Sequence, residues 1–260
     1  MKLWLNGGLQ EEDQARIAPA DRGLLLGDGL FETMAAQAGE VPALARHYAR
    51  LCKGASLLRL PVALSQDDLV GIVREVLASN GLSDAALRLT LTRGTGPRGL
   101  WPGEACSPTL LLTASAMPAP APPARVMICS IRRDETSKLS TIKSLNYLPN
   151  VLARLEAAEQ GADDALLLNQ AGRVAEASAA NLFVCLGGKW FTPPVSEGAL
   201  PGIRRAMLLE SGHVQEALLS LADLTKAHAL CLGNALSLRP VAALDAYIYP
   251  DIATPYGVFV

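Results

Sequence analysis

The sequence has few of the features that mark secreted, metal-binding or membrane-spanning proteins. Its five cysteines are scattered through 260 residues and form no Cys-x-x-Cys pair, which argues against a disulfide scaffold and a zinc finger. The three histidines share no metal-ligand spacing, so no metal site is expected. There is no run of eighteen or more apolar residues, and Asn6-Gly7-Gly8 interrupts the N-terminus before a signal segment can form. We therefore expect a cytoplasmic protein with no membrane partner.

Positive and negative side chains are nearly balanced. The chain has 23 Lys and Arg against 25 Asp and Glu, a net charge of -2. Nucleic-acid-binding proteins usually show a basic excess, so no nucleic-acid partner is expected. Half of the residues are hydrophobic, and a chain of this length buries roughly 70–75% of its unfolded surface. A core of that size needs neither disulfides nor metal to fold.

One proline-rich segment divides the chain. Residues 117–123 hold four prolines in seven positions, which prevents a helix and favours a stiff, extended linker. We expect an N-terminal domain over 1–116, this linker over 117–123, and a C-terminal domain over 124–260. Strands cluster beside helices instead of alternating strictly with them, which is typical of α+β domains.

Hydrophobic periodicity and turn residues predict the main elements. Helices are expected at 43–58, from 65 onward, and at 144–160, 202–210 and 220–228. Strands are expected at 3–5, 87–93, 109–113, 125–131, 164–169, 181–186, 189–191 and 229–232.

The segment Gly94 to Gly99 matches the pattern G-x-G-x-x-G. A dinucleotide site needs a helix to begin at this pattern, because the helix N-terminus holds the pyrophosphate. Pro97, Pro102 and the nearby glycines leave no room for that helix, so we reject the Rossmann interpretation. A nicotinamide-dependent oxidoreductase that uses this loop stays as a rival hypothesis. Arg98 in the loop is either an exposed arginine or a contact for a substrate anion.

Lysine is scarce, and one lysine stands in an apolar setting. Only six lysines occur, and Lys143 lies between Ile142 and Leu145 at a predicted strand-to-helix junction. A single lysine is most often an exposed surface residue, and this is the alternative interpretation of Lys143. Apolar surroundings, however, lower the pKa of an amine from about 10.4 and make it a nucleophile toward carbonyl groups. Lys143 is therefore a candidate Schiff-base lysine.

A lysine that binds pyridoxal 5'-phosphate (PLP) needs a carboxylate for the ring nitrogen and a site for the phosphate. Glu176 lies among small residues before an apolar strand, where a carboxylate needs a compensating cation; a turn-facing glutamate is the alternative. Gly202, Ile203 and Arg204 begin a predicted helix, whose first N–H groups can bind an anion. Arg50 could add a bidentate contact.

Several ordered motifs together resemble the class IV aminotransferases, which are PLP enzymes of fold type IV. The likeness extends from Asp21 to Val241 and rests on motifs at 27–33, 47–51, 143–153, 176–183 and 200–204. The family includes D-amino-acid and branched-chain aminotransferases and aminodeoxychorismate lyase. The resemblance implies two α+β lobes and a homodimer.

The resemblance also implies roles for individual residues. Lys143 would form the Schiff base with PLP, and Glu176 would hold the protonated ring nitrogen. The remaining cofactor-binding residues would be Arg50, Leu200, Gly202, Ile203, Arg204 and Asn234. The residues expected to contact substrate are Phe31, Arg98 and Tyr147.

The resemblance leaves the reaction open between transamination and elimination. The short chain and Asn234-Ala235-Leu236 resemble the lyases, which eliminate pyruvate from 4-amino-4-deoxychorismate and leave 4-aminobenzoate. Lys143-Ser144 resembles the transaminases. The loop ending in Arg98 resembles the carboxylate site of D-amino-acid aminotransferases, but Phe31 and Leu100 replace the tyrosine and histidine of that site. We favour an aminotransferase acting on D- or branched-chain amino acids and 2-keto acids. A non-catalytic member that keeps the cofactor is the third hypothesis.

Overall fold

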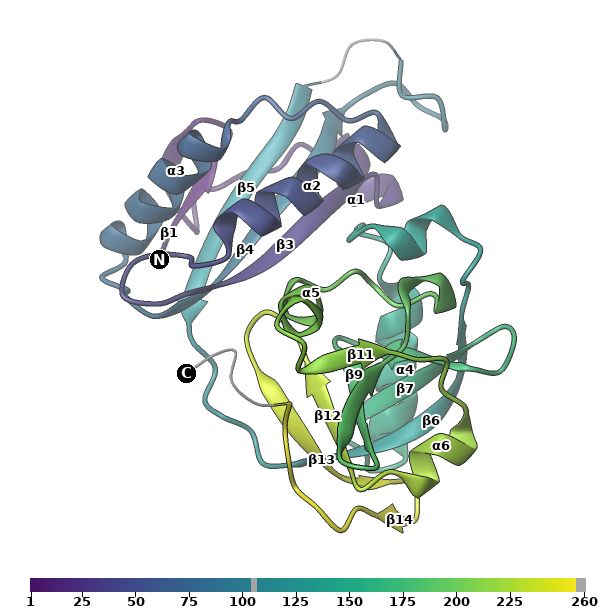
Figure 1. The fold of residues 1–260 in the computed structure, drawn as a ribbon. Helices are drawn as coiled ribbons and strands as arrows, with labels where there is room; N and C mark the ends of the chain where they lie inside the picture. Colours follow the sequence, from purple (N-terminus) through teal and green to yellow (C-terminus); the bar gives the residue numbers. More distant parts are fainter. Residues whose placement is uncertain (104–106, 256–260) are drawn as a thin grey trace. The chain divides into compact units, whose positions relative to one another are not determined.

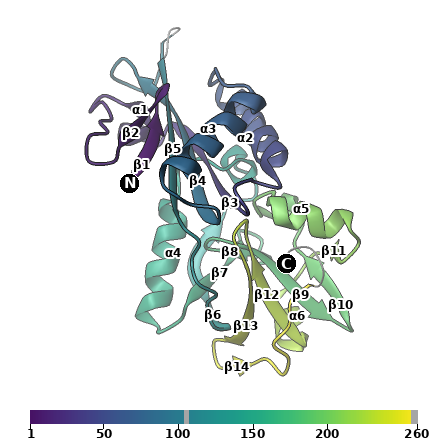
Figure 2. The ribbon, with the colours of Figure 1, turned by 90° about the vertical axis from the view of Figure 1, so that its left-hand side faces the viewer.

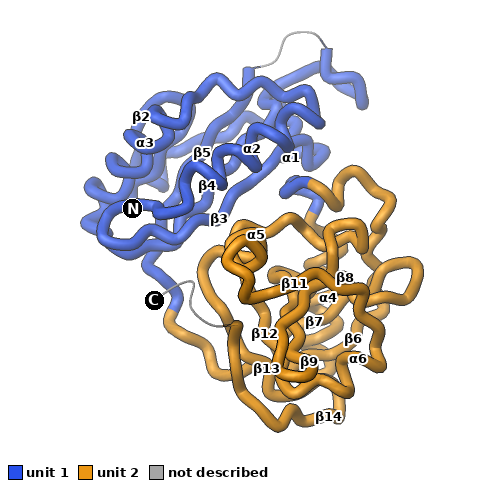
Figure 3. The backbone as a smooth tube through the Cα atoms, in the orientation of Figure 1, with its two compact units in different colours: residues 1–118, 142–146 blue, residues 119–141, 147–260 orange. Residues whose placement is uncertain are grey.

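The computed structural model describes residues 1–103 and 107–255, which form two compact units (Figure 3). Unit 1 contains residues 1–118 and 142–146, and unit 2 contains residues 119–141 and the chain from 147 onward. The division at Pro118 falls inside the proline-rich segment. The sequence predicted one continuous second domain. In the structure, residues 142–146 belong to unit 1, where they pair with a strand, and the chain before and after them belongs to unit 2.

Unit 1 is built on an antiparallel sheet with the order β2-β1-β5-β4-β3 (Figure 1). Its strands are β1 (Lys2–Leu5), β2 (Gly8–Glu11), β3 (Gly29–Ala36), β4 (Ala85–Thr95) and β5 (Ser107–Ala116). The long strands β3 and β4 pair residue for residue from Gly29↔Thr92 to Ala36↔Ala85. Alternate residues therefore point to opposite faces of the sheet along this whole length.

Three helices belong to unit 1: α1 (Arg22–Leu26), α2 (Leu44–Leu58) and α3 (Gln66–Ser79). Figures 1 and 2 show α2 and α3 over the same face of the sheet. Their apolar side chains form one core with the leucines and methionine of the strands that point to that face, such as Leu30, Met34 and Leu89. The start of α3 agrees with its sequence signal, because Ser65 and Asp68 form a reciprocal capping box.

An arginine network joins the end of α2 to the start of β3. Arg93 donates to the carbonyl oxygens of Leu58 and Arg59 at 2.8 and 3.1 Å, at the C-terminus of α2. Its guanidinium also binds Asp28, which accepts a further hydrogen bond from Arg22 at 3.0 Å. Burial acts to raise the pKa of Asp28, but the two arginines outweigh it and hold the pKa below its usual value.

Unit 2 contains a mixed sheet with the order β11-β10-β9-β12-β13-β6-β7-β8, and β14 pairs with β13. Its strands are β6 (Ala124–Arg133), β7 (Asp164–Asn169), β8 (Val174–Ala177), β9 (Asn181–Leu186), β10 (Lys189–Thr192), β11 (Val214–Glu216), β12 (Ala229–Gly233), β13 (Leu238–Leu244) and β14 (Tyr247–Ile248). β6 runs parallel to both β7 and β13, whereas β7 and β8 form an antiparallel pair. This mixed sheet with separate helices confirms the α+β fold class.

The helices of unit 2 are α4 (Leu148–Glu159), α5 (Ile203–Glu210) and α6 (Leu221–Lys226), with short 3-10 turns η1 (Lys138–Thr141) and η2 (Val195–Glu197). α4 packs on β6 and β7 through Ala153 and Ala157, which are fully buried. The prediction started this helix at Ser144, four residues too early. No helix in the described part of the chain is long and apolar enough to cross a membrane.

Candidate active site

Lys143 lies on a short segment whose backbone is fixed on both sides. The N–H of Phe31 donates to the carbonyl of Lys143 at 3.0 Å, and the N–H of Leu145 donates to the carbonyl of Gly29 at 3.0 Å. Ser144 also bridges to Leu30, so residues 143–145 extend unit 1 along the outer edge of β3. These contacts hold the lysine backbone in one place on the sheet.

The close approach of this segment to β3 depends on a glycine at position 29. A Cβ atom at Gly29 would lie 2.6 Å from the carbonyl oxygen of Leu91 and 2.9 Å from the side chain of Leu145. A larger residue at position 29 would therefore push β3 away from the lysine segment. Ile142, only 4% exposed, anchors the start of the segment in the core of unit 1.

The amine of Lys143 lies over an aromatic ring. Its Nζ is 4.3 Å from the ring centroid of Phe31. The guanidinium carbon of Arg88 lies 4.0 Å from the same centroid. The ring of Phe31 therefore contacts both basic side chains within unit 1.

Arg50, the expected phosphate contact, belongs to a buried ionic cluster in unit 1. Its Nε and Nη2 donate to the two oxygens of Glu32 at 2.8 and 2.6 Å, a bidentate pair. Nδ1 of His47 lies 2.6 Å from the same carboxylate. Side-chain exposure is 1% for Glu32, 3% for His47 and 10% for Arg50.

The charge on Glu32 is stabilised inside this cluster. Burial by itself raises the pKa of the carboxyl group, but hydrogen bonds from Arg50 and His47 and the positive charge of Arg50 outweigh it. The net result is a pKa below the ordinary value, so Glu32 is ionised at neutral pH. Its carboxylate fixes the plane of the Arg50 guanidinium, a role that sequence analysis did not assign to Glu32 or His47.

Glu176 is a buried carboxylate in β8 of unit 2. It is 5% exposed, and its Oε1 lies 3.1 Å from Nε of Arg133 at the end of β6. Its Oε2 accepts a hydrogen bond of 2.8 Å from the N–H of Leu200. A buried carboxylate needs this kind of cation and donor, and here both are present.

Sequence analysis missed Arg133. The residue reaches Glu176 because β6, β7 and β8 are neighbours: Arg133 pairs with Asn169 on β7, and Glu176 pairs with Leu167 on the same strand. Arg133 also donates to the carbonyl of Gly198 at 2.8 Å, which fixes the turn before Leu200. Only the strand order, which no local motif encodes, brings this arginine to the glutamate.

The start of α5 has the features of an anion site. Gly202 is the N-cap and supplies no side chain to the first N–H groups of the helix, which have no partners within it. A Cβ atom at Gly202 would lie 2.0 Å from Oδ1 of Asn181. Nδ2 of Asn181 donates to the carbonyl of Leu200 at 2.9 Å, so this buried amide fixes the chain before the helix. The N–H groups of Ile203 and Arg204 begin the helix at this point.

Arg204 is buried and bonded to the loop that contains Asn234. Its Nε donates to the carbonyl of Asn234, and its Nη2 donates to the carbonyl of Ala235 at 3.2 Å. Burial lowers the pKa of the guanidinium to about 10, so it is still charged at neutral pH. The side-chain oxygen of Asn234 accepts hydrogen bonds from Leu236 and Ser237 at 2.9 and 3.1 Å and shapes its own turn.

The other expected substrate contacts lie at the edges of elements. Tyr147 is the half-buried N-cap residue of α4 in unit 2. Arg98 lies in the exposed loop after β4 in unit 1. Arg22 holds that loop by donating to the carbonyls of Pro97, Gly99 and Leu100 at 3.3, 2.9 and 2.9 Å. No helix follows in the described residues 96–103.

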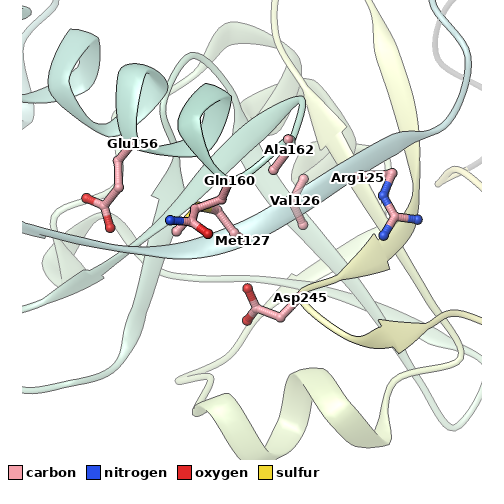
Figure 4. A pocket seen from close by; sticks show the side chains of 8 residues that line it. Arg125, Val126, Met127, Glu156, Gln160, Ala162 and Asp245 are labelled. Carbon is pink, nitrogen blue, oxygen red and sulfur yellow. The ribbon is translucent and has the colours of Figure 1, made fainter.

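A separate pocket in unit 2 contains none of these residues (Figure 4). It has a volume of about 320 Å³ and lies between β6 and the end of α4. Its charged lining residues are Arg125, Glu156 and Asp245. Glu156 is already bonded to the N–H and hydroxyl of Ser130 at 2.8 and 2.6 Å. No group of three or more metal-ligating side chains is found among the described residues.

Comparison with known proteins agrees with the motifs. The sequence model of the family "Amino-transferase class IV" matches residues 29–244. A protein of Methanocaldococcus jannaschii, provisionally named a branched-chain-amino-acid aminotransferase, is 37% identical over 99% of this chain and 98% of its own. The D-alanine aminotransferase of Bacillus licheniformis is 31% identical over 81% of this chain and 74% of its own.

A solved structure agrees with the fold. The 4-amino-4-deoxychorismate lyase of Pseudomonas aeruginosa superimposes with a TM-score of 0.84 at 33% identity, covering 97% of this chain and 94% of its own. The matching fold is that of the fold type IV PLP enzymes. The chain therefore belongs to the class IV aminotransferase family, whose members are PLP-dependent enzymes.

Proposed function

We propose that this chain is an aminotransferase that moves an amino group between an amino acid, of the D- or branched-chain type, and a 2-keto acid. The observation that carries the PLP chemistry of the proposal is the placement of Lys143, whose backbone is paired with β3 and whose amine lies over the ring of Phe31. An amine held in this way can form the Schiff base with PLP and later exchange protons at one point in space. The likeness to relatives named as aminotransferases supports transamination.

The residues of the chain fit the chemical groups of PLP. The buried carboxylate of Glu176 suits a protonated ring nitrogen, and Leu200 precedes the helix start whose N–H groups suit a phosphate. In this proposal Gly202, Ile203 and Arg204 bind the phosphate, and Asn234 shapes the adjacent turn. Arg50 of unit 1 keeps the phosphate role that the family resemblance implies. Arg133 is a positioning residue, because it fixes the carboxylate of Glu176.

When bound, PLP supplies an electron sink for the bond that breaks at the α-carbon of the substrate. The residues of the chain do the rest. Glu176, held by Arg133 and by the N–H of Leu200, would accept a hydrogen bond from the ring nitrogen. The amine of Lys143 would remove the α-proton of the substrate as a general base and then, as an ammonium group, act as the general acid of the reaction. Phe31, Tyr147 and Arg98 are proposed to contact the substrate.

Aminodeoxychorismate lyase is the alternative function, supported by the likeness to the Pseudomonas aeruginosa lyase structure. The same lysine, carboxylate and phosphate site serve both reactions, so only the substrate separates them. We would incubate the yellow PLP-bound protein with both enantiomers of a panel of amino acids and with aminodeoxychorismate. Loss of the yellow band with release of one keto acid supports transamination. Release of pyruvate and 4-aminobenzoate with the band retained refutes it in favour of the lyase.

We also propose that the protein is a cytoplasmic homodimer. Support for a partner comes from α4, where Leu148, Val151, Leu152 and Leu155 follow a helical i, i+3, i+4, i+7 spacing and are 73%, 48%, 52% and 55% exposed. An apolar stripe of this kind is typical of an interface. Support for a reducing compartment comes from free thiols at Cys52, Cys129, Cys185 and Cys231; Cys106 lies outside the described residues. A Leu152→Glu variant that remains dimeric in sedimentation would contradict the use of this face.

A further inference from the structure

A groove in unit 1 lies apart from the residues that the proposed function uses. Its volume is about 670 Å³, and small-molecule sites typically have about 300–1,000 Å³. Most of its lining is apolar and comes from α3, from the chain before it and from three strands of the sheet; examples are Trp4, Leu64, Ile72, Leu91 and Leu110. All of its described lining residues belong to unit 1. The groove is therefore complete within one compact unit.

The groove lies on the face of the sheet that the helices cover. Leu91 is opposite Leu30 in the β3–β4 pair, and both belong to the core under α2 and α3. Phe31, whose ring contacts Lys143, is the next residue along β3 and therefore points to the other face. A ligand in the groove and a substrate at Lys143 would thus lie on opposite sides of the sheet.

The apolar surface of the groove is recessed. Leu64, Ile72 and Leu91 are buried, whereas Trp4 and Leu110 are half-buried. None of the large apolar side chains that line the groove is among the exposed ones of the described chain. A protein partner needs an accessible apolar centre that is poor in charged residues. A concave apolar floor below a polar rim is typical instead of a small-molecule site.

A glycine leaves space in the wall of the groove that α3 forms. Gly71 lies between Asp67 and Glu75, each four residues away, so these three positions share one face of the helix. A Cβ atom at Gly71 would meet no heavy atom of the described residues within 4 Å. Only proline is less favourable than glycine inside a helix, and no close contact requires the glycine here. Its effect is to widen the groove.

The charged residues of the groove are all acidic. Asp67, Asp68 and Glu75 line it, and none of its described lining residues is basic. Asp68 is bonded to Ser65 in the capping box, and these hydrogen bonds hold the pKa of its carboxyl group below the ordinary value. Asp67 and Glu75 are exposed, and their side chains have no hydrogen bond or ion pair with other described residues. The rim therefore offers two carboxylates that need no release from another partner.

We propose that this groove is a second ligand site, which binds a small organic ammonium ion with an apolar body. The recessed floor takes the apolar body, and the carboxylates of Asp67 and Glu75 attract the cation. The indole ring of Trp4 adds a surface that also attracts cations. A carboxylate or phosphate ligand would instead meet three negative charges with no cation to balance them. The site does not depend on the reaction at Lys143.

The test uses the PLP-bound enzyme and three probes that share a phenylethyl body. N,N-dimethyl-2-phenylethylamine is the cation, and as a tertiary amine it cannot form a Schiff base with PLP. 2-Phenylethanol is the neutral probe, and 3-phenylpropanoate is the anion. Titration calorimetry measures the dissociation constants. The indole N–H resonance of Trp4, assigned with a Trp4→Phe variant, reports binding in the groove itself.

We expect the amine to shift the Trp4 resonance at lower concentration than the alcohol, and the anion not to shift it. Added salt should weaken the binding of the amine but not that of the alcohol, because salt screens exposed charges. Gly71→Leu should abolish the shift by filling the groove. It should keep the yellow band and unfold at or above the wild-type temperature, because leucine favours a helix and its side chain enters open space.

A double variant, Asp67→Asn with Glu75→Gln, removes the charge of the rim but preserves its shape. The dissociation constant of the amine should rise roughly 2- to 30-fold, the range for two exposed ion pairs, and that of the alcohol should not change. Glu40→Gln is the matched control, because it removes an exposed carboxylate of unit 1 that does not line the groove. It should bind the amine as the wild type does.

Five results would overturn the proposal. The amine could leave the Trp4 resonance unchanged, or the alcohol or the anion could shift it at equal or lower concentration. The double variant could bind the amine as tightly as the wild type does. Gly71→Leu could also retain wild-type affinity, which would place the amine elsewhere, or it could change the oligomeric state in sedimentation, which would make the groove an interface between copies of the chain. None of these results bears on the yellow band or on the reaction with amino acids, so they leave the proposed function intact.

Discussion

The ionic cluster of Glu32, His47 and Arg50 predicts a large effect from the loss of a single charge. Glu32→Gln preserves the shape of the side chain but leaves the Arg50 guanidinium, 10% exposed, without its counter-charge. The amide nitrogen also turns a donor toward donors of Arg50 or His47. Removing one partner of a buried ion pair costs about 3–5 kcal/mol, and the slight exposure of Arg50 favours the lower end.

The matched control is Glu40→Gln. Glu40 pairs with Arg74 at 3.0 Å, but the two side chains are 69% and 62% exposed. An exposed pair of this kind contributes about 0–1 kcal/mol. Stability is measured by thermal and urea unfolding at neutral pH, followed by circular dichroism. The thermal midpoint of Glu32→Gln should be lower than that of wild type by roughly 6–12 °C, and that of Glu40→Gln should be near wild type. Equal midpoints for the two variants would refute the argument that burial gives this pair its energy.

The pH dependence of the stability of wild type and of Glu32→Gln gives a second check. The folded pKa of Glu32 lies below its ordinary value, so its contribution to stability is fully present above that ordinary value and is lost as the pH falls through the folded value. The difference in unfolding free energy between wild type and Glu32→Gln should therefore be constant near neutral pH and shrink in acid. A difference that grows on acidification would show that Glu32 is not ionised in the folded protein.

Two further predictions concern unit 2. Glu176→Gln should retain PLP but slow proton abstraction strongly, because an amide no longer favours the ring proton, and Arg133→Met should slow it in the same direction; unchanged single-turnover rates in Glu176→Gln would contradict the role of the carboxylate. Gly202→Ala should weaken PLP binding and cost about 1–3 kcal/mol of stability, because its Cβ would overlap Oδ1 of Asn181; adding Asn181→Ala should restore part of the stability, and failure to restore any would show that the clash is not the cause.

Local sequence signals predicted the elements better than the contacts between them. Periodicity placed α2 within one residue of its start, and the Ser65–Asp68 signal placed the start of α3, because both depend on neighbouring residues. The helix expected from Ser144 begins instead at Leu148. Residues 143–145 form hydrogen bonds with β3, a strand more than a hundred positions earlier, and so do not form the first turn of the helix.

The missed residues of the site have the same explanation. Arg133 and Glu176 are brought together by the order of β6, β7 and β8, and Arg88 is brought to Lys143 through the β3–β4 register and the Phe31 ring. Neither relation follows from residue spacing. The motif residues themselves could be found from the sequence because a resemblance to a family assigns roles to positions, whereas the residues that orient them follow only from the fold.

The account depends most directly on the covalent bond between Lys143 and PLP. Borohydride reduction of the yellow protein, followed by proteolysis and mass spectrometry, should find the reduced cofactor on the peptide that contains Lys143. Lys143→Ala should be colourless or lose its colour on dialysis, and it should give no labelled peptide. A label on any other lysine, or a labelled and active Lys143→Ala protein, would contradict the account.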